Sequence, residues 1–169
     1  MRHWDLFVRV NHWLVALLFF SNYFVIDNGE EVHEWAGYFI AALVFGRLAW
    51  AFVGPKNARL SQFFPTTRTL LKHIQLLKQS KWQQAERRYK SHNPLGALMV
   101  IFLWIILLSC VATGYMQEMD AFWGVEWLQE LHENLANVAL TAITLHVSAV
   151  VATQKLSGEK QIQAMLWRR

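Results

Sequence analysis

Four of the seven histidines fall within long apolar segments of this chain: His12, His33, His132 and His146. Ionisable side chains are costly inside a membrane, so their placement there is informative. His132 and His146 share one segment and are 14 residues apart. At about 100° per residue, this spacing returns to nearly the same helix face, roughly 21 Å further along the axis. A single helix can therefore offer an imidazole at two depths.

The other two histidines can complete two pairs at those depths. His33 stands at the outer start of its segment, like His132, and His12 stands near the inner end of its own, like His146. Two neutral imidazoles from facing helices occupy both axial positions of a haem iron and leave none open. Such a haem carries electrons instead of binding oxygen. The sequence therefore predicts an inner and an outer haem site.

Other uses of a membrane histidine are open at this point. A histidine can be a hydrogen-bonded residue between helices or part of a proton path. A transporter would also need carboxylates inside the membrane, and only Glu34 and Glu133, both near the surface, come close. A zinc site would need further ligands that the apolar surroundings of each pair do not supply.

Four segments are apolar enough to carry these histidines across about 30 Å of hydrocarbon. They cover about 8–26, 32–53, 94–116 and 131–151 in a chain that is 54% hydrophobic. The first is interrupted by Arg9, Asn11, His12 and Asn22, but no small-residue cleavage site follows it, as a signal peptide would require. We expect an all-α fold, a four-helix transmembrane bundle that forms a single membrane domain over residues 1–169.

Charge predicts how this bundle is oriented. The loop 54–91 carries nine Lys or Arg residues against one acid, Glu86, whereas the connections 27–31 and 117–130 carry acids and no Lys or Arg. Basic loops stay in the cytoplasm, so this loop and both termini should be cytoplasmic. The net charge of +4 reflects that asymmetry and not nucleic-acid binding. Within the loop, apolar residues at helical spacing indicate either an amphipathic helix on the inner membrane surface or a solvated loop helix: Leu70, Leu71, Ile74 and Leu77.

The single cysteine, Cys110, limits the type of cofactor. One cysteine allows neither an internal disulfide nor a thiolate cluster nor the C-x-x-C-H attachment of c-type haem. Any haem must therefore be held without a covalent bond, as haem b is.

Small and basic residues beside the histidines fit a flat macrocycle. Gly37, Ala136 and Ala142 each lie one helical turn from a histidine, where small side chains let either a porphyrin or another helix approach. Arg47 lies 14 residues after His33, so it returns to the same face at the inner depth.

We assign Arg47 to the propionates of the inner haem, with snorkelling to the membrane surface as the alternative. His92, just before Pro94, either bonds the same propionates or caps the helix or faces solvent.

Five short segments, together with Leu145-His146, match a family pattern. They are WDLFVRVNHW at 4–13, HEWAGY at 33–38, FGRLAW at 45–50, HNPLGA at 92–97 and LHENLAN at 131–137. On these residues the chain resembles the bacterial cytochrome b561 and hydrogenase-type cytochrome b family across nearly its whole length. The resemblance implies a multi-pass protein of the bacterial inner membrane with two haem b groups. His12 and His146 would ligate the cytoplasmic-side haem, and His33 and His132 the periplasmic-side haem.

The resemblance also implies a function: electron transfer between membrane quinone, either ubiquinone or menaquinone, and a periplasmic redox protein such as a c-type cytochrome. The acidic outer connections could steer a basic partner, or simply follow from the charge bias of membrane proteins. Quinone could bind near Trp35, Trp123 and Trp127, although Trp at a membrane surface is commonly an anchor.

Two alternatives are a superoxide:ubiquinone oxidoreductase and a cytochrome b subunit of a hydrogenase or dehydrogenase. The short outer connections disfavour docking to a large hydrogenase. Their lack of Lys and Arg disfavours an anionic substrate such as superoxide. Whether this electron-transfer protein is itself a quinone oxidoreductase is left open by the sequence.

Overall fold

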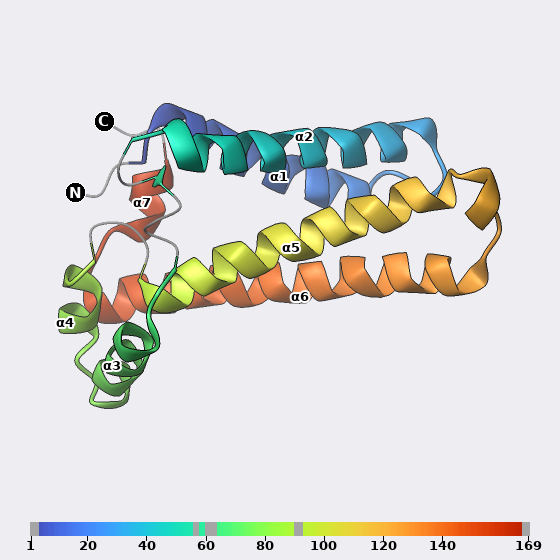
Figure 1. Cartoon of the computed structure of the whole chain (residues 1–169). Helices are drawn as coiled ribbons and strands as arrows, with labels where there is room; N and C mark the ends of the chain where they lie inside the picture. The colour runs from blue at the N-terminus through green and yellow to red at the C-terminus, as the bar shows by residue number, and fades with distance from the viewer. Residues whose placement is uncertain (1–3, 56–57, 60–63, 90–92, 167–169) are drawn as a thin grey trace.

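The computed structural model describes residues 4–55, 58–59, 64–89 and 93–166, and the regular elements in these ranges are all helices (Figure 1). The four long helices are α1 (Leu6–Phe24), α2 (Glu31–Val53), α5 (Pro94–Gln117) and α6 (Glu126–Ser157). The shorter ones are α3 (Thr67–Lys78), α4 (Trp82–Arg87), the 3-10 turn η3 (Asp120–Phe122) and α7 (Gln161–Met165). The expected all-α class is confirmed.

Three of the four expected membrane spans are confirmed as candidates. Helices α2, α5 and α6 are long and apolar enough to cross a membrane, and they are the three such helices in the described ranges. Helix α1 forms over the first expected span but is not among them. Its polar residues explain the difference, because they lower the mean hydropathy of a helix that is otherwise long enough: Arg9, Asn11, His12 and Asn22.

Local signals set where the long helices begin and end. The Asp5 carboxylate accepts a hydrogen bond from the Val8 amide, so α1 begins two residues before the expected 8–26. Asn93 caps α5 in the same way through the Gly96 amide, and Pro94 fits the first helical position. Helix α6 runs well beyond the expected 131–151, for about 48 Å, and ends where Gly158 adopts a left-handed conformation (φ +72°).

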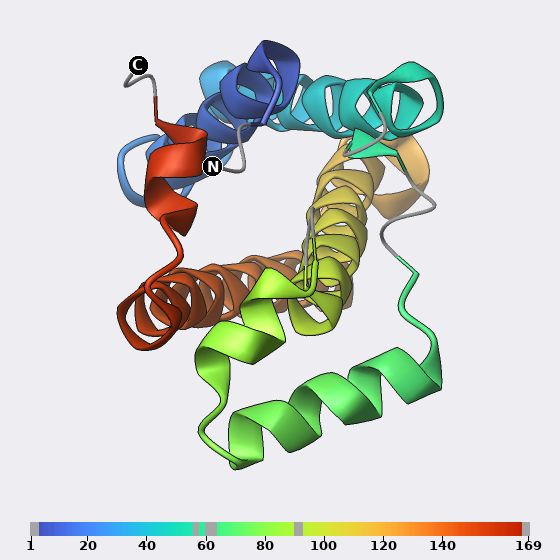
Figure 2. The same ribbon diagram turned by 90° about the vertical axis from the view of Figure 1, so that its left-hand side faces the viewer.

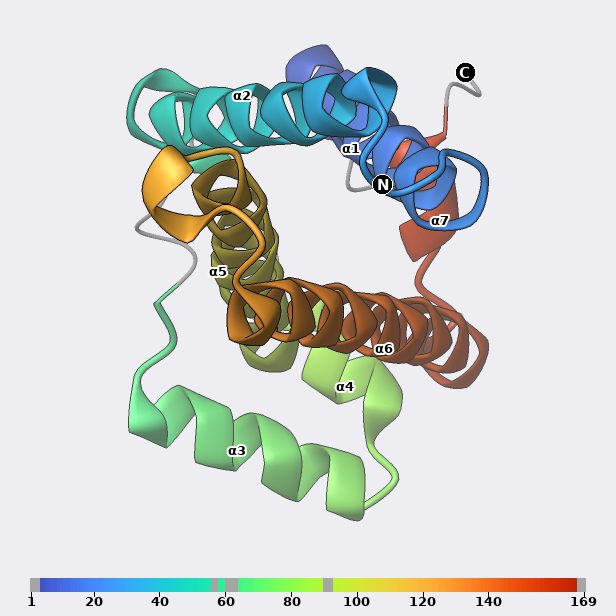
Figure 3. The same cartoon turned by 90° about the vertical axis from the view of Figure 1, so that its right-hand side faces the viewer.

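Neighbouring long helices run in opposite directions, and contacts connect α1 to α2, α2 to α5 and α5 to α6. Figures 2 and 3 look along these helices from opposite ends and show α1 and α6 standing apart, with α7 between them at one end. A shared apolar core joins all four helices: Phe19, Ile40, Val44, Ile106, Leu107 and Ala139.

The two ends of the long helices differ in charge. We call the end that carries α3, α4, α7 and the start of α1 the basic end (Figure 1). The opposite end, where the connection 25–30 and η3 lie, is the acidic end. The His12–His146 pair belongs to the basic-end half and the His33–His132 pair to the acidic-end half.

Candidate functional site

At the basic end, His12 of α1 and His146 of α6 face each other. Their ring centres are 6.5 Å apart and their planes are inclined at 64°. Both side chains are half-buried. The ring of Trp13 lies edge-on to His12, with centres 5.4 Å apart. The two histidines thus connect the two long helices that stand apart in Figures 2 and 3.

At the acidic end, His33 of α2 and His132 of α6 form a second pair of nearly the same shape. Their ring centres are 6.2 Å apart and their planes are inclined at 63°. His132 and His146 belong to one unbroken helix, α6, as the 14-residue spacing predicted. The structure therefore brings together the four histidines in the two combinations expected from the sequence, while their role as ligands stays a prediction.

The ring separations fit two imidazoles on opposite sides of one metal ion. A metal–imidazole bond is about 2.0 Å long and a ring nitrogen lies about 1.2 Å from its own ring centre, so two such rings have centres about 6.4 Å apart. In the described part of the chain, no three His, Cys, Asp or Glu side chains gather closely enough to hold a metal ion. Each pair therefore offers two protein ligands. Haem iron takes two from the protein, whereas zinc sites use three or four.

His132 is held in place by helix α5. Its Nδ1 lies 3.0 Å from the Cys110 carbonyl oxygen and 3.2 Å from the Thr113 hydroxyl. With the proton on Nδ1, the ring donates to the carbonyl, and Nε2 is left for a metal ion. Such a bond fixes both the tautomer and the direction of a ligand histidine.

The other histidine of this pair, His33, lies beside polar atoms that lack hydrogen-bond partners. His33 Nδ1 is buried without a hydrogen-bond partner, and so is Oδ1 of Asn22, whose Nδ2 donates to the His33 carbonyl at 3.1 Å. Buried polar atoms are nearly always hydrogen-bonded. These two orphaned atoms therefore fit a site shaped for a further bound group.

Two glycines flank the acidic-end pair. A Cβ atom built on Gly37, one turn after His33, would meet no atom within 4 Å. A Cβ atom on Gly114 of α5 would lie 3.2 Å from Cε1 of His132. Gly37 thus borders open space, as expected of a residue under a macrocycle, while Gly114 lets the His132 ring approach α5. Sequence reasoning missed Gly114 because nothing along the chain connects it to a histidine on another helix.

The small residues expected on α6 are split in role. Ala136 is half-buried, and Ala142 is 4% exposed and part of the helix packing. Ala142 therefore fits the second role considered for small residues, in which they let another helix approach. Asn11, also missed, is 7% exposed and donates to the Leu43 carbonyl of α2 at 2.7 Å. This bond fixes α1 against α2 directly beside His12.

Arg47 is buried at the basic end, against the loop that follows α2. It is 5% exposed, and both terminal nitrogens of its guanidinium donate to the Ala58 carbonyl at 3.2 Å. The guanidinium carbon also lies 5.5 Å from the centre of the Trp104 ring. A role toward propionates stays a prediction. His92 lies outside the described residues.

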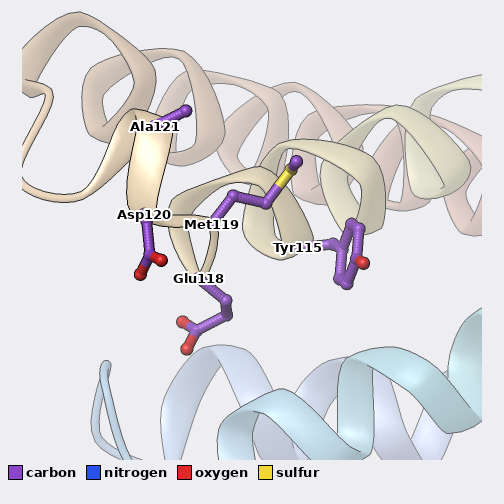
Figure 4. A pocket seen from close by; sticks show the side chains of 5 residues that line it. All are labelled: Tyr115, Glu118, Met119, Asp120 and Ala121. Carbon is purple, nitrogen blue, oxygen red and sulfur yellow. The ribbon is translucent and has the colours of Figure 1, made fainter.

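A pocket opens at the acidic end, beside the corner between α5 and η3 (Figure 4). Its volume is about 460 Å³, and its lining residues are Tyr115, Glu118, Met119, Asp120 and Ala121. Glu118 and Asp120 point the same way, toward the ribbons of α1 and α2. The pocket thus presents two neighbouring carboxylates and a phenol. The three tryptophans considered for quinone lie outside this pocket and are 55–76% exposed: Trp35, Trp123 and Trp127.

Comparison with known proteins gives one family. Residues 3–168 match the family described as prokaryotic cytochrome b561. A probable Ni/Fe-hydrogenase B-type cytochrome subunit of Azotobacter chroococcum mcd 1 is 29% identical over 149 residues, which cover 73% of this chain and 62% of that protein.

A protein of the same description from Azotobacter vinelandii is 28% identical with the same coverage. Another, from Rhodobacter capsulatus, is 24% identical over 203 residues, covering 94% of this chain and 77% of its own length. This chain thus spans 62% of the length of the two Azotobacter proteins. No solved structure matches it.

Proposed function

The chain belongs to the prokaryotic cytochrome b561 family, a family of membrane cytochromes b of electron transport, and from this premise we propose that it is a di-haem cytochrome that transfers electrons between quinone and a periplasmic redox protein. The observation that carries the proposal is the presence of two histidine pairs with nearly equal ring separations, 6.5 and 6.2 Å. One pair alone could be an accident of packing. Two pairs at two depths, each with one histidine from α6, fit a route along the protein.

The four histidines would hold the two haem groups, His12 with His146 and His33 with His132. Bound haem iron supplies reversible one-electron oxidation and reduction at each position. The chain's own contribution is to hold the imidazoles. Cys110 and Thr113 orient His132, and Asn11 anchors the helix that presents His12. Gly37 leaves space beside the acidic-end pair.

We propose that α1, α2, α5 and α6 form a four-helix transmembrane bundle and a single domain, with the basic end in the cytoplasm. Helix α1 is interrupted by polar residues, and two of these are used inside the protein: Asn11 bonds to α2 and His12 faces His146. Internal partners lower the cost of polar side chains at membrane depth. The basic loop and the bacterial family support the inner membrane and cytoplasmic termini.

The acidic end would receive the redox partner. Its described connections carry carboxylates and no Lys or Arg, and the Glu118–Asp120 pocket opens there. This charge favours a basic partner such as a c-type cytochrome. Quinone, either ubiquinone or menaquinone, would be the membrane-side reactant near the exposed Trp35, Trp123 and Trp127.

A second candidate is the cytochrome b subunit of a hydrogenase, which the similarity to the Azotobacter and Rhodobacter proteins favours. A superoxide:ubiquinone oxidoreductase is a weaker candidate, because the acidic connections would repel an anionic substrate.

The test is a transfer assay with the protein in lipid nanodiscs. Quinol is added to reduce the protein, and the reduction of a soluble basic c-type cytochrome is followed at increasing ionic strength. We expect the rate to fall with salt and to fall in E118Q/D120N. E159Q, which alters a carboxylate at the basic end, is the matched control and should leave the rate unchanged.

A rate that ignores both salt and E118Q/D120N would overturn the acidic docking site. Failure of quinol to reduce the protein would overturn the quinone assignment. Reduction of the protein by a hydrogenase but not by quinol would favour the second candidate.

A further inference from the structure

Helices α3 and α4 form an arm at the basic end, and its inner face is well packed. Leu70, His73, Ile74 and Leu77 recur at helical spacing on the side of α3 that is turned inward; His73 is 1% exposed and the others are half-buried. Contacts connect α3 to α4 and α5. The arm therefore has a defined position, and its opposite side is turned away from the protein.

A buried carboxylate locks the arm in that position. Glu86 of α4 is 1% exposed and accepts hydrogen bonds from Asn93 Nδ2 at 2.8 Å and Gln161 Nε2 at 3.1 Å. His73 Nε2 lies 3.8 Å from the same carboxylate. These contacts join α3, α4, α7 and the cap of α5. Removing a partner from a buried carboxylate is costly, so the arm is held as a unit.

The outer side of the arm is basic and carries exposed apolar side chains. Its cations are all exposed: Arg68, Lys72, Lys78, Lys81 and Arg88. Arg87 is exposed too, but it pairs with Glu159 at 3.3 Å. The one acid in the loop 54–91 is Glu86, which is buried. Leu71 and Phe64 are 61% and 64% exposed. This surface thus combines positive charge with apolar groups that a soluble polyanion would not bury.

The position of α3 matches a membrane surface. It lies level with the basic ends of α5 and α6 in Figure 1 and runs across their direction. Viewed along the long helices, α3 lies outside the outline of α1, α2, α5 and α6 (Figures 2 and 3). If those helices stand across a membrane, α3 lies parallel to its surface and over lipid.

We propose that the outer side of α3 is a docking surface for the headgroups of anionic phospholipids in the inner leaflet. Arg68 and Lys72 bind the headgroups, and Leu71 enters the apolar layer next to them. Clusters of cations at the cytoplasmic surface attract anionic lipids, and amphipathic helices lie in this interface. The proposal rests on the transmembrane placement and does not depend on haem.

The test uses the full chain in nanodiscs of phosphatidylcholine alone or mixed with phosphatidylglycerol, with amide hydrogen exchange of residues 64–78 as the readout. We expect slower exchange in the mixture than in phosphatidylcholine, and loss of the difference at high salt. In R68Q/K72Q the lipid-dependent protection should fall by about five-fold per cation removed. The control K155Q/K160Q removes the same charge from exposed positions at the same end and should keep it.

Several outcomes would overturn the proposal. Equal exchange in both lipids would do so, as would equal losses in R68Q/K72Q and K155Q/K160Q, which would indicate only a diffuse positive end. Protection by a soluble polyanion in detergent, without protection by anionic lipid, would assign the surface to a soluble partner. L71S tests the apolar part and should speed exchange in the mixture while the long helices keep their protection.

Discussion

His12 and His146 come from the first and last long helices, yet their ring centres lie 6.5 Å apart with planes inclined at 64°. His33 and His132 repeat this geometry at 6.2 Å and 63°. The two pairs have similar geometry and share helix α6, which fits the same kind of binding site repeated at two depths. The spacing is close to the roughly 6.4 Å expected of two imidazoles that bind one metal ion.

Replacement of one histidine should remove one haem. In H146A we expect loss of the basic-end haem, and in H132A loss of the acidic-end haem, so each variant keeps about half of the haem, because the other pair is intact. The measurement is haem per chain by pyridine haemochrome, with circular dichroism as a check of helix content. The two variants serve as controls for each other. Loss of both haems from either variant with full helix content would contradict independent pairs.

Gly37→Ala tests the open space beside His33. A Cβ atom there meets no protein atom within 4 Å, and a Gly→Ala change inside a helix normally stabilises it by roughly 0.5–1 kcal/mol. We nevertheless expect G37A to weaken haem binding at the acidic end, because a macrocycle would fill that space. The measurement is the rate of haem transfer to an acceptor protein.

Gly46→Ala is the matched control on the same helix, because its Cβ atom would make an ordinary contact, 3.8 Å from Cζ of Phe7. Haem binding in G46A should be unchanged. If G37A binds haem as tightly as G46A does, no macrocycle lies over Gly37.

Gly114→Ala tests the contact between α5 and His132. The added Cβ atom would lie 3.2 Å from Cε1, so the ring must shift and its hydrogen bond to the Cys110 carbonyl is strained. Changes in groups that orient a metal ligand typically cost about 10–100-fold in affinity. We expect a loss in this range at the acidic-end haem, and an altered electron paramagnetic resonance signal of that haem alone. A change in the signal of the basic-end haem would show that the ligands are paired differently.

The packing of α3 against α4 and α5 should depend on pH through His73. Burial lowers the pKa of His73 from its usual 6.5, and Glu86 at 3.8 Å and Tyr89, with ring centres 5.6 Å apart, are the titratable groups that face it. The imidazole binds its proton more tightly when α3 is detached from the protein than when it is packed. The packed state of α3 is therefore fully stable above about pH 6.5 and becomes less stable as the pH falls below that value.

Amide exchange of residues 67–78, corrected for the intrinsic pH effect, should therefore reveal faster opening at about pH 5.5 than at about pH 7.5. In H73L this difference should disappear. Slower opening at the lower pH would mean that the attraction between the Glu86 carboxylate and the protonated His73 outweighs the effect of burial.

Helical periodicity placed two histidines on one face of one helix, and the depths of all four in the predicted spans suggested their pairing. Residues 14 apart share a helix face whatever the surroundings, so His132 and His146 could be placed before any contact was known. The length of α6 could not be predicted from hydropathy, because its ends are polar and its stop depends on the left-handed Gly158.

Contacts between helices could not be predicted from the sequence. The roles of Gly114, Thr113 and Asn11 depend on how α5 and α2 are rotated against their neighbours, and no local pattern encodes that rotation. Arg47 lies at the basic end, and its bond to the Ala58 carbonyl depends on where the loop after α2 returns.

The most direct test of the central claim is the dithionite-reduced minus oxidised absorption spectrum of the purified protein, with haem per chain counted by pyridine haemochrome. The histidine pairs predict two low-spin b-type haems per chain that do not react with carbon monoxide. A well-folded protein that contains no haem, or one whose haem binds carbon monoxide, would contradict the account.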